Sequence, residues 1–226
     1  IGISECFEII HRAFDISARS DNGASSLPKN TILYHIHNPN PYERLHFLKH
    51  YPKARFLHLI RNPIQSMESW MLANEKLIIG KVDNKLTDEQ SIDCWRGAID
   101  KIINMFQQLV SPVNKPSLSY GIRLEDIKRD PHQFMPKVAA WMGINDHQEL
   151  YQSSFCGLQY WGPESVTRKI TGFDTMAIDR QIGRLLGPRD VLIFETLFWP
   201  LSNSYSYTDM DNVGFRLRLA EIRPWL

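Results

Sequence analysis

The sequence predicts an α/β fold: a three-layer sandwich in which helices flank a central parallel sheet. Two short apolar runs, at residues 31–37 and 54–60, have the pattern of buried strands. A helical pattern at 42–51 separates them, and a strand–helix–strand order forms a right-handed unit with parallel strands. The length of 226 residues, 43% of them hydrophobic, fits one globular domain over 1–226.

The other elements continue this alternation along the chain. Further helices are predicted at 3–17, from the Arg61 turn to about 74, and at 87–112, 131–143, 176–186 and 189–199, with a third strand at 117–123. Asp130 and Pro131 have the residue types that begin a helix, and Gly143 has the type that ends one. Glu125 and Asp126, just after the third strand, are expected to anchor neighbouring loops.

Charge and cysteine content exclude several classes of protein. The net charge is +1 without a long basic run, so no nucleic-acid partner is expected. Cys6, Cys94 and Cys156 are far apart and form no CxxC pair, which indicates neither a metal site nor a disulfide framework. We expect reduced thiols in the cytoplasm. One bridge in a lumenal enzyme is the alternative if the chain belongs to a longer polypeptide.

No apolar run reaches the length of a membrane span, and no signal peptide opens the sequence, so no membrane segment is expected in this chain. The sequence does not indicate an oligomeric state.

Arg61 follows an apolar strand directly and precedes a predicted helix. Asn62 can cap that helix, and Pro63 suits its first position, where no N–H is needed. Arg61 therefore lies at the carboxyl edge of the predicted sheet, where open parallel sheets bind ligands. A guanidinium group beside the N–H groups of a helix start favours phosphate or another oxyanion.

The segment FLHLIRNPIQSMESW, residues 56–70, resembles the 3′-phosphate-binding segment of sulfotransferases that use PAPS (3′-phosphoadenosine 5′-phosphosulfate). That segment has an apolar strand, Arg, Asn or Asp, often Pro, and Ser eight positions after Arg. The resemblance implies that Arg61 and Ser69 bind the 3′-phosphate. An Arg side chain can reach over the first turn toward Ser69, roughly 10 Å along the helix. The alternative is an Arg that caps a carbonyl and a Ser that only packs.

The resemblance covers about residues 31–200 and implies a fold of the P-loop nucleotide-hydrolase type. It implies transfer of a sulfonyl group from PAPS to an acceptor hydroxyl or amine, with PAP as product and no metal. The acceptor would be a small molecule, or a glycan or peptide. The family's early Gly-rich loop, which cradles the 5′-phosphosulfate, has no counterpart here. We therefore expect this sequence to lack the N-terminal strand and loop of the domain, which either precede Ile1 or are lost.

His37 is the first candidate for the catalytic base. His37-Asn38-Pro39 matches the His-x-Pro part of a family stretch whose histidine takes the acceptor proton. An imidazole suits this role because its pKa lies near neutrality. His35, two residues earlier on the same strand face, is the second candidate. A structural histidine, an H-x-H metal pair and a Glu base are the alternatives.

Arg168, Lys169 and Gly172 form a late basic loop that could wrap a phosphate. It loosely resembles the family's Arg-Lys-Gly loop, which closes on the 3′-phosphate, and an ordinary solvated loop is the alternative.

Two other functions remain open. A P-loop-type kinase would need a Gly-Lys-Ser/Thr triplet, and none occurs. A non-catalytic module that binds PAP or another nucleotide would share the fold.

Overall fold

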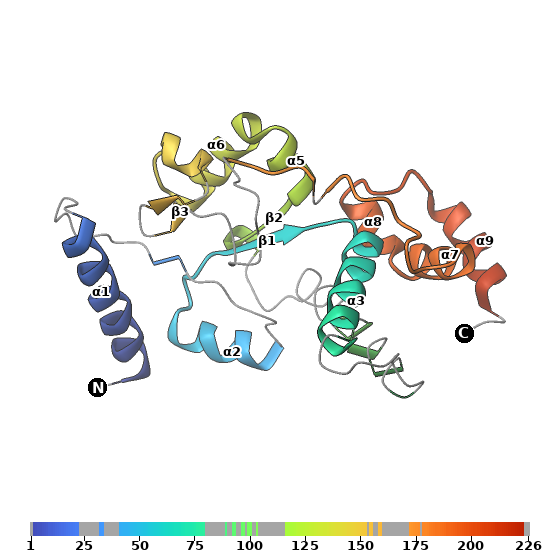
Figure 1. The fold of residues 1–226 in the computed structure, drawn as a ribbon, viewed down its shortest axis with the longest axis horizontal. Coiled ribbons are helices and arrows are strands. Elements are labelled where there is room, and N and C mark those ends of the chain that lie inside the picture. The colour runs from blue at the N-terminus through green and yellow to red at the C-terminus, as the bar shows by residue number, and fades with distance from the viewer. Residues whose placement is uncertain are drawn as a thin grey trace. The chain divides into compact units, whose positions relative to one another are not determined.

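The computed structural model describes residues 2–22, 32–33, 41–79, 89, 92–93, 96–97, 99–100, 103, 116–152, 154–155, 158–159, 172–176 and 178–223. The chain divides into two compact units. The first unit contains Ile1–Leu57, Pro112–Tyr120 and Asp126–Thr175, and the second contains His58–Ser111, Gly121–Glu125 and Met176–Leu226. Figure 1 labels most of their helices and strands.

The first unit is mostly helical. Its elements are α1 (Ile3–Asn22), α2 (Pro41–His50), α6 (Pro131–Met142), the 3₁₀ helices η1 (Pro116–Leu118) and η2 (Gln148–Tyr151), and a hairpin of β3 (Ser154–Phe155) and β4 (Leu158–Gln159). The predicted helix at 42–51 is confirmed as α2, whereas α1 continues five residues past the predicted end, to Asn22.

Helix α6 has the ends that its sequence predicts. The Asp130 side chain accepts a hydrogen bond from the Gln133 N–H at 3.0 Å, which satisfies one of the free donors of the first turn. Gly143 ends the helix in the left-handed conformation, with a φ of 72°, which side chains disfavour.

The predicted strand at 31–37 is described only at Ile32 and Leu33. Both residues are exposed and lie outside any helix or strand. At these two positions the predicted strand is wrong. At the other five, which include His35 and His37, it lies outside the described residues and stays a prediction.

Strands β1 (Phe56–Ile60) and β2 (Ser119–Arg123) are neighbours in a two-stranded sheet. Asn62 and Glu125, each two residues beyond the end of its strand, are joined by a hydrogen bond of 3.0 Å from the Asn62 N–H to Glu125 Oε1. The carboxyl ends of the two strands therefore lie together, and the strands run parallel. This parallel pair among helices confirms the predicted α/β class.

The helices of the second unit include α3 (Pro63–Ile79), α7 (Pro188–Leu197), α8 (Trp199–Ser204) and α9 (Asn212–Ile222), and α5 (Leu124–Arg129) begins at its boundary. The predicted helix at 189–199 is confirmed in the main as α7, which ends at Leu197. The predicted helix at 176–186 is wrong, because its described residues form turns and bends. Gly183 has a φ of 97°, and its N–H bonds to a side chain instead of a helix carbonyl.

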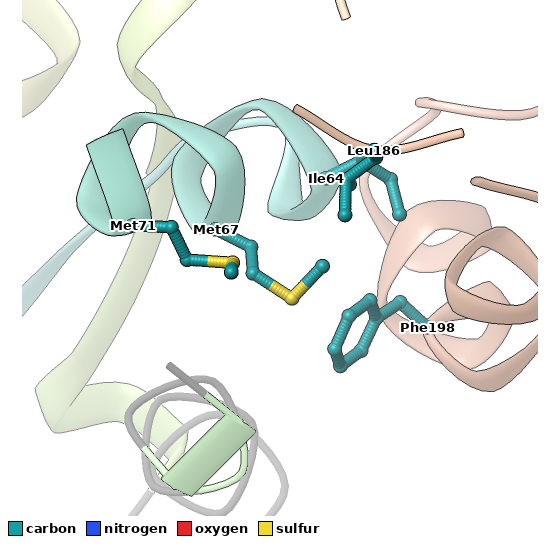
Figure 2. Packing of buried hydrophobic residues seen from close by; sticks show 5 residues of the cluster. All are labelled: Ile64, Met67, Met71, Leu186 and Phe198. Carbon is teal, nitrogen blue, oxygen red and sulfur yellow. The ribbon is translucent and has the colours of Figure 1, made fainter. Parts of the chain in front are cut away.

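The core of the second unit is built on one face of α3. Ile64, Met67 and Met71 follow one another at spacings of three and four residues, which places them on the same side of the helix. Figure 2 shows these three side chains directed toward Leu186 and Phe198. This cluster joins α3 to α7 and to the segment before it.

A buried carboxylate, Glu68, joins the same two regions. Its side chain is fully enclosed, with 0% exposed. Its Oε1 atom accepts three backbone hydrogen bonds, from Gly183 at 3.0 Å, Leu185 at 2.7 Å and Leu186 at 3.1 Å. Burial by itself raises the pKa of Glu68, but these N–H groups and the Arg184 guanidinium together outweigh it and lower the pKa below its usual value.

None of the helices in the described part of the chain is both long and apolar enough to cross a membrane.

We expect Met67→Ala to lower the free energy of unfolding by roughly 2–5 kcal/mol, because it leaves a cavity in the core beside Phe198. Urea denaturation followed by tryptophan fluorescence measures this change. Leu217→Ala is the control, since Leu217 is 68% exposed on α9 of the same unit and should change stability by less than about 0.5 kcal/mol. Equal losses in the two variants would contradict this packing.

We expect the stabilising effect of Glu68 to depend on pH. Because its folded pKa lies below the ordinary value of 4.5, the carboxylate stabilises the fold above that value, and this stabilisation is lost as the pH falls through the folded pKa. Glu68→Gln should cost about 1.5–3 kcal/mol at neutral pH. The difference from wild type should shrink below pH 4.5, and a difference that stays constant down to acid pH would refute the assignment.

Candidate anion-binding site

The turn between β1 and α3 is held by its own residues. The Asn62 side chain accepts a hydrogen bond from the Gln65 N–H at 3.0 Å, and the Asn62 carbonyl accepts one from the Ser66 N–H at 2.9 Å. Pro63 occupies the first helical position. The predicted cap is therefore confirmed, and it fixes the direction in which the chain leaves Arg61.

Glu125, in α5 just after β2, stabilises this turn. One carboxylate oxygen accepts the hydrogen bond from the Asn62 N–H, and the other accepts one from the Tyr207 hydroxyl at 2.6 Å. The same hydroxyl lies 3.2 Å from the carbonyl oxygen of Ile60. Glu125 is 5% exposed, so this bridge is buried, and the anchoring role expected for Glu125 is confirmed.

Gln65 links Arg61 to the segment before α7. Its side-chain oxygen accepts a hydrogen bond from Arg61 Nε at 2.9 Å. Its amide nitrogen donates to the carbonyls of Ile178 at 3.0 Å and Arg180 at 2.5 Å. The carbonyl and both N–H groups of this buried amide are thus used, and they tie the Arg61 side chain to the backbone that carries Arg180.

Ser69 lies beside Arg180. The Arg180 Nη1 atom donates to the Ser69 hydroxyl oxygen at 3.2 Å, and the Arg180 side chain is otherwise exposed. Ser69, eight residues after Arg61, is half-buried on the second turn of α3. The exposed Arg180 guanidinium therefore meets the hydroxyl that the sequence predicts as a phosphate ligand.

Two other guanidinium groups, those of Arg180 and Arg184, act electrostatically on Arg61. Burial lowers the pKa of Arg61, and the charge of Arg180 and then that of Arg184 lower it further. Glu125 and Tyr207 act in the opposite direction. Guanidinium groups keep their charge in proteins, so Arg180 and Arg184 both repel Arg61. An anion placed among them would relieve this repulsion, which makes the site suited to an oxyanion such as phosphate.

The described residues contain no group of three or more His, Cys, Asp or Glu side chains that could hold a metal ion.

The structure describes three of the seven predicted site residues. Arg61 and Ser69 both lie in the second unit and both connect to the segment 178–186. Gly172 lies in the first unit with a φ of 74°, and a Cβ atom there would be 3.2 Å from the Tyr151 carbonyl oxygen. His35, His37, Arg168 and Lys169 lie outside the described residues. Their roles, and phosphate binding by Arg61 and Ser69, stay predictions.

Sequence reasoning missed Gln65, Arg180 and Arg184. The segment Arg180-Gln-Ile-Gly183-Arg184 has two cations beside a glycine, a composition suited to an anion-binding loop. The prediction of a helix over 176–186 concealed this signal. Nothing in the sequence pairs Arg180 with Ser69, which precedes it by 111 residues.

Comparison with known proteins supplies the family. A search of curated proteins finds no match. Among solved structures, a sulfotransferase domain from the curacin biosynthetic pathway is similar to this chain, with 18% identity and a TM-score of 0.43. The alignment covers 74% of this chain, which spans 61% of the length of that domain.

The sulfotransferase family matches residues 4–148, more than half of the chain. The matched range includes β1, the capped turn, Arg61 and Ser69, whereas Arg180 and Arg184 lie beyond it. The chain belongs to the sulfotransferase family.

Proposed function

We propose that this chain binds PAPS and transfers its sulfonyl group to the hydroxyl or amine of an acceptor, and that Arg61, Ser69 and Arg180 bind the 3′-phosphate. One observation carries the proposal. Around the start of α3, the Arg61 guanidinium is held by Gln65 and the Ser69 hydroxyl is held by Arg180, and an anion there would relieve the repulsion that Arg180 and Arg184 exert on Arg61. The family match supports the transferase class.

A 3′-phosphate fits this set of residues chemically. It carries nearly two negative charges and presents several acceptor oxygens, which suit the planar donors of guanidinium groups. The Ser69 hydroxyl can donate to phosphate while its oxygen accepts from Arg180. The two nearby carboxylates, Glu68 and Glu125, are already occupied by backbone N–H groups and the Tyr207 hydroxyl. They therefore oppose the cations less than free carboxylates would.

The chain's own residues would have separate tasks in the reaction. Arg61, Ser69 and Arg180 bind and orient the nucleotide, which reduces the entropy cost of bringing the reactants together. His37, or His35 in its place, takes the proton of the acceptor. Arg168, Lys169 and Gly172 add a second basic loop at the phosphate. PAPS supplies an activated sulfonyl group, and PAP remains after its transfer.

We also propose an acceptor class, a domain organisation and a location for this chain. The acceptor is a small molecule, or a glycan or peptide. Both compact units belong to one sulfotransferase domain, whose Gly-rich loop is not found in this sequence. The location is the cytoplasm, which suits three widely spaced cysteines.

We expect Arg61→Ala to weaken PAP binding roughly ten- to a hundredfold, since a hydrogen bond to a charged group contributes about 1.5–3 kcal/mol. Isothermal titration calorimetry with PAP measures the loss. AMP, which lacks the 3′-phosphate, should bind wild type and variant about equally. Arg218→Ala is the control, because Arg218 is a surface cation of the same unit, paired with Glu195 at 3.2 Å. Equal affinity of the wild type for PAP and AMP would overturn the assignment.

We expect His37→Ala to abolish sulfonyl transfer while leaving PAP affinity nearly unchanged, because a general base acts in the chemical step and not in ground-state nucleotide binding. Transfer of radiolabelled sulfonyl from PAPS and calorimetry with PAP measure the two effects separately. Turnover that survives in His37→Ala and is lost in His35→Ala would assign the base to His35. The assay uses a protein that includes any Gly-rich loop preceding this sequence, and tight PAP binding by that protein without turnover would indicate a binding module.

A further inference from the structure

Three side chains on α3 bind the segment that carries Arg180. Gln65, Glu68 and Ser69 are spaced by three and one residues, which places them on the same side of the helix within little more than one turn. Gln65 bonds to the carbonyls of Ile178 and Arg180, Glu68 bonds to the N–H groups of Gly183, Leu185 and Leu186, and Ser69 accepts from the Arg180 side chain. The segment 178–186 is thus held on α3 at both of its ends.

Of these three side chains, Glu68 makes the most hydrogen bonds to the segment. A single oxygen of this buried carboxylate accepts three backbone hydrogen bonds, and each is charge-assisted. These three N–H groups belong to residues outside any helix. Unlike the N–H groups inside α7, they have no helix carbonyl to bond to. The second oxygen, Oε2, is 3.9 Å from Arg184 Nε, and the described residues give it no hydrogen-bond partner. Glu68 therefore fixes the shape of the segment close to both Arg180 and Arg184.

We propose that Glu68 is a positioning residue for the anion site: it holds the segment 178–186 so that Arg180 stays against Ser69, and so increases affinity for a phosphate that it does not touch. This inference rests on the proposed function, because PAP is the anion concerned. Glu68 is 0% exposed and acts through the three backbone N–H groups bound to its Oε1, so it does not need to contact the ligand.

The proposal predicts an effect opposite in sign to simple electrostatics. Glu68 is a negative charge among cations, and its removal would make the site more positive and leave Arg184 without its carboxylate. Charge alone would then predict that Glu68→Gln binds an anion more tightly. Positioning predicts weaker binding, because an amide cannot accept three N–H bonds on one oxygen with the strength of a carboxylate.

A double-mutant cycle on PAP affinity tests this inference. The variants are Glu68→Gln, Arg180→Ala and the double variant, each titrated calorimetrically with PAP. We expect Glu68→Gln to weaken binding about three- to thirtyfold in the wild-type background and by less than about twofold in the Arg180→Ala background. Glu195→Gln, a half-exposed carboxylate of the same unit, should leave PAP affinity unchanged.

Two outcomes would overturn the inference. Unchanged or tighter PAP binding by Glu68→Gln would show that charge and not positioning decides the effect. An equal fold-loss in both backgrounds would show that Glu68 acts through general stability and not through Arg180. If Glu68→Gln does not fold, Glu68→Asp takes its place. Aspartate keeps the negative charge, but its side chain is one methylene shorter. We expect Glu68→Asp to weaken PAP binding less than Glu68→Gln, and again only in the background that retains Arg180.

Amide hydrogen exchange separates this inference from the proposed function. In Glu68→Gln the amides of Gly183, Leu185 and Leu186 should exchange at least about tenfold faster, because their acceptor is weakened. The amide of Gly214, held by Asp211 at 2.7 Å, should be unchanged. Wild-type protein that fails to bind PAP would refute the proposed function alone. Unchanged exchange at the three amides would refute the positioning role, whatever the result with PAP.

Discussion

A buried carboxylate needs donors around it, and Glu68 obtains them from a distant part of the chain. Leaving this charge without partners in the core would cost several kcal/mol. Three backbone N–H groups satisfy its Oε1, and the charge of the nearby Arg184 faces its Oε2. The segment before α7 is consequently drawn onto α3 in an irregular conformation, beside the hydrophobic cluster of Met67 and Phe198.

The proposed anion site depends on this attachment. Arg61 and Ser69 are placed by the capped start of α3, but Arg180 reaches Ser69 only because Gln65 and Glu68 hold its segment. Cations that gather in this way repel one another, and the lowered pKa of Arg61 reflects this after the effect of burial. The stability of the core thus supports an arrangement that is electrostatically unfavourable without an anion.

Local signals predicted the parts of the fold whose causes are local. Asn62 and Pro63 begin α3, and Asp130 and Gly143 mark the two ends of α6, because capping and backbone conformation involve residues only a few positions apart. The helix predicted at 176–186 failed for the opposite reason. Its N–H groups bond to a side chain more than a hundred residues earlier, and no periodicity of hydrophobic residues contains that information.

The sequence by itself determined the α/β class, the strand–turn–helix at Arg61 and the eight-residue spacing to Ser69, since each depends on neighbouring residues and on standard helix geometry. It also carried the resemblance that agrees with the family match. Only the tertiary structure brought Arg180 to Ser69, and brought Tyr207 to Glu125, which bonds to the turn between β1 and α3. Such contacts join residues 82 and 111 positions apart, and they form because buried polar groups must find partners wherever the fold supplies them.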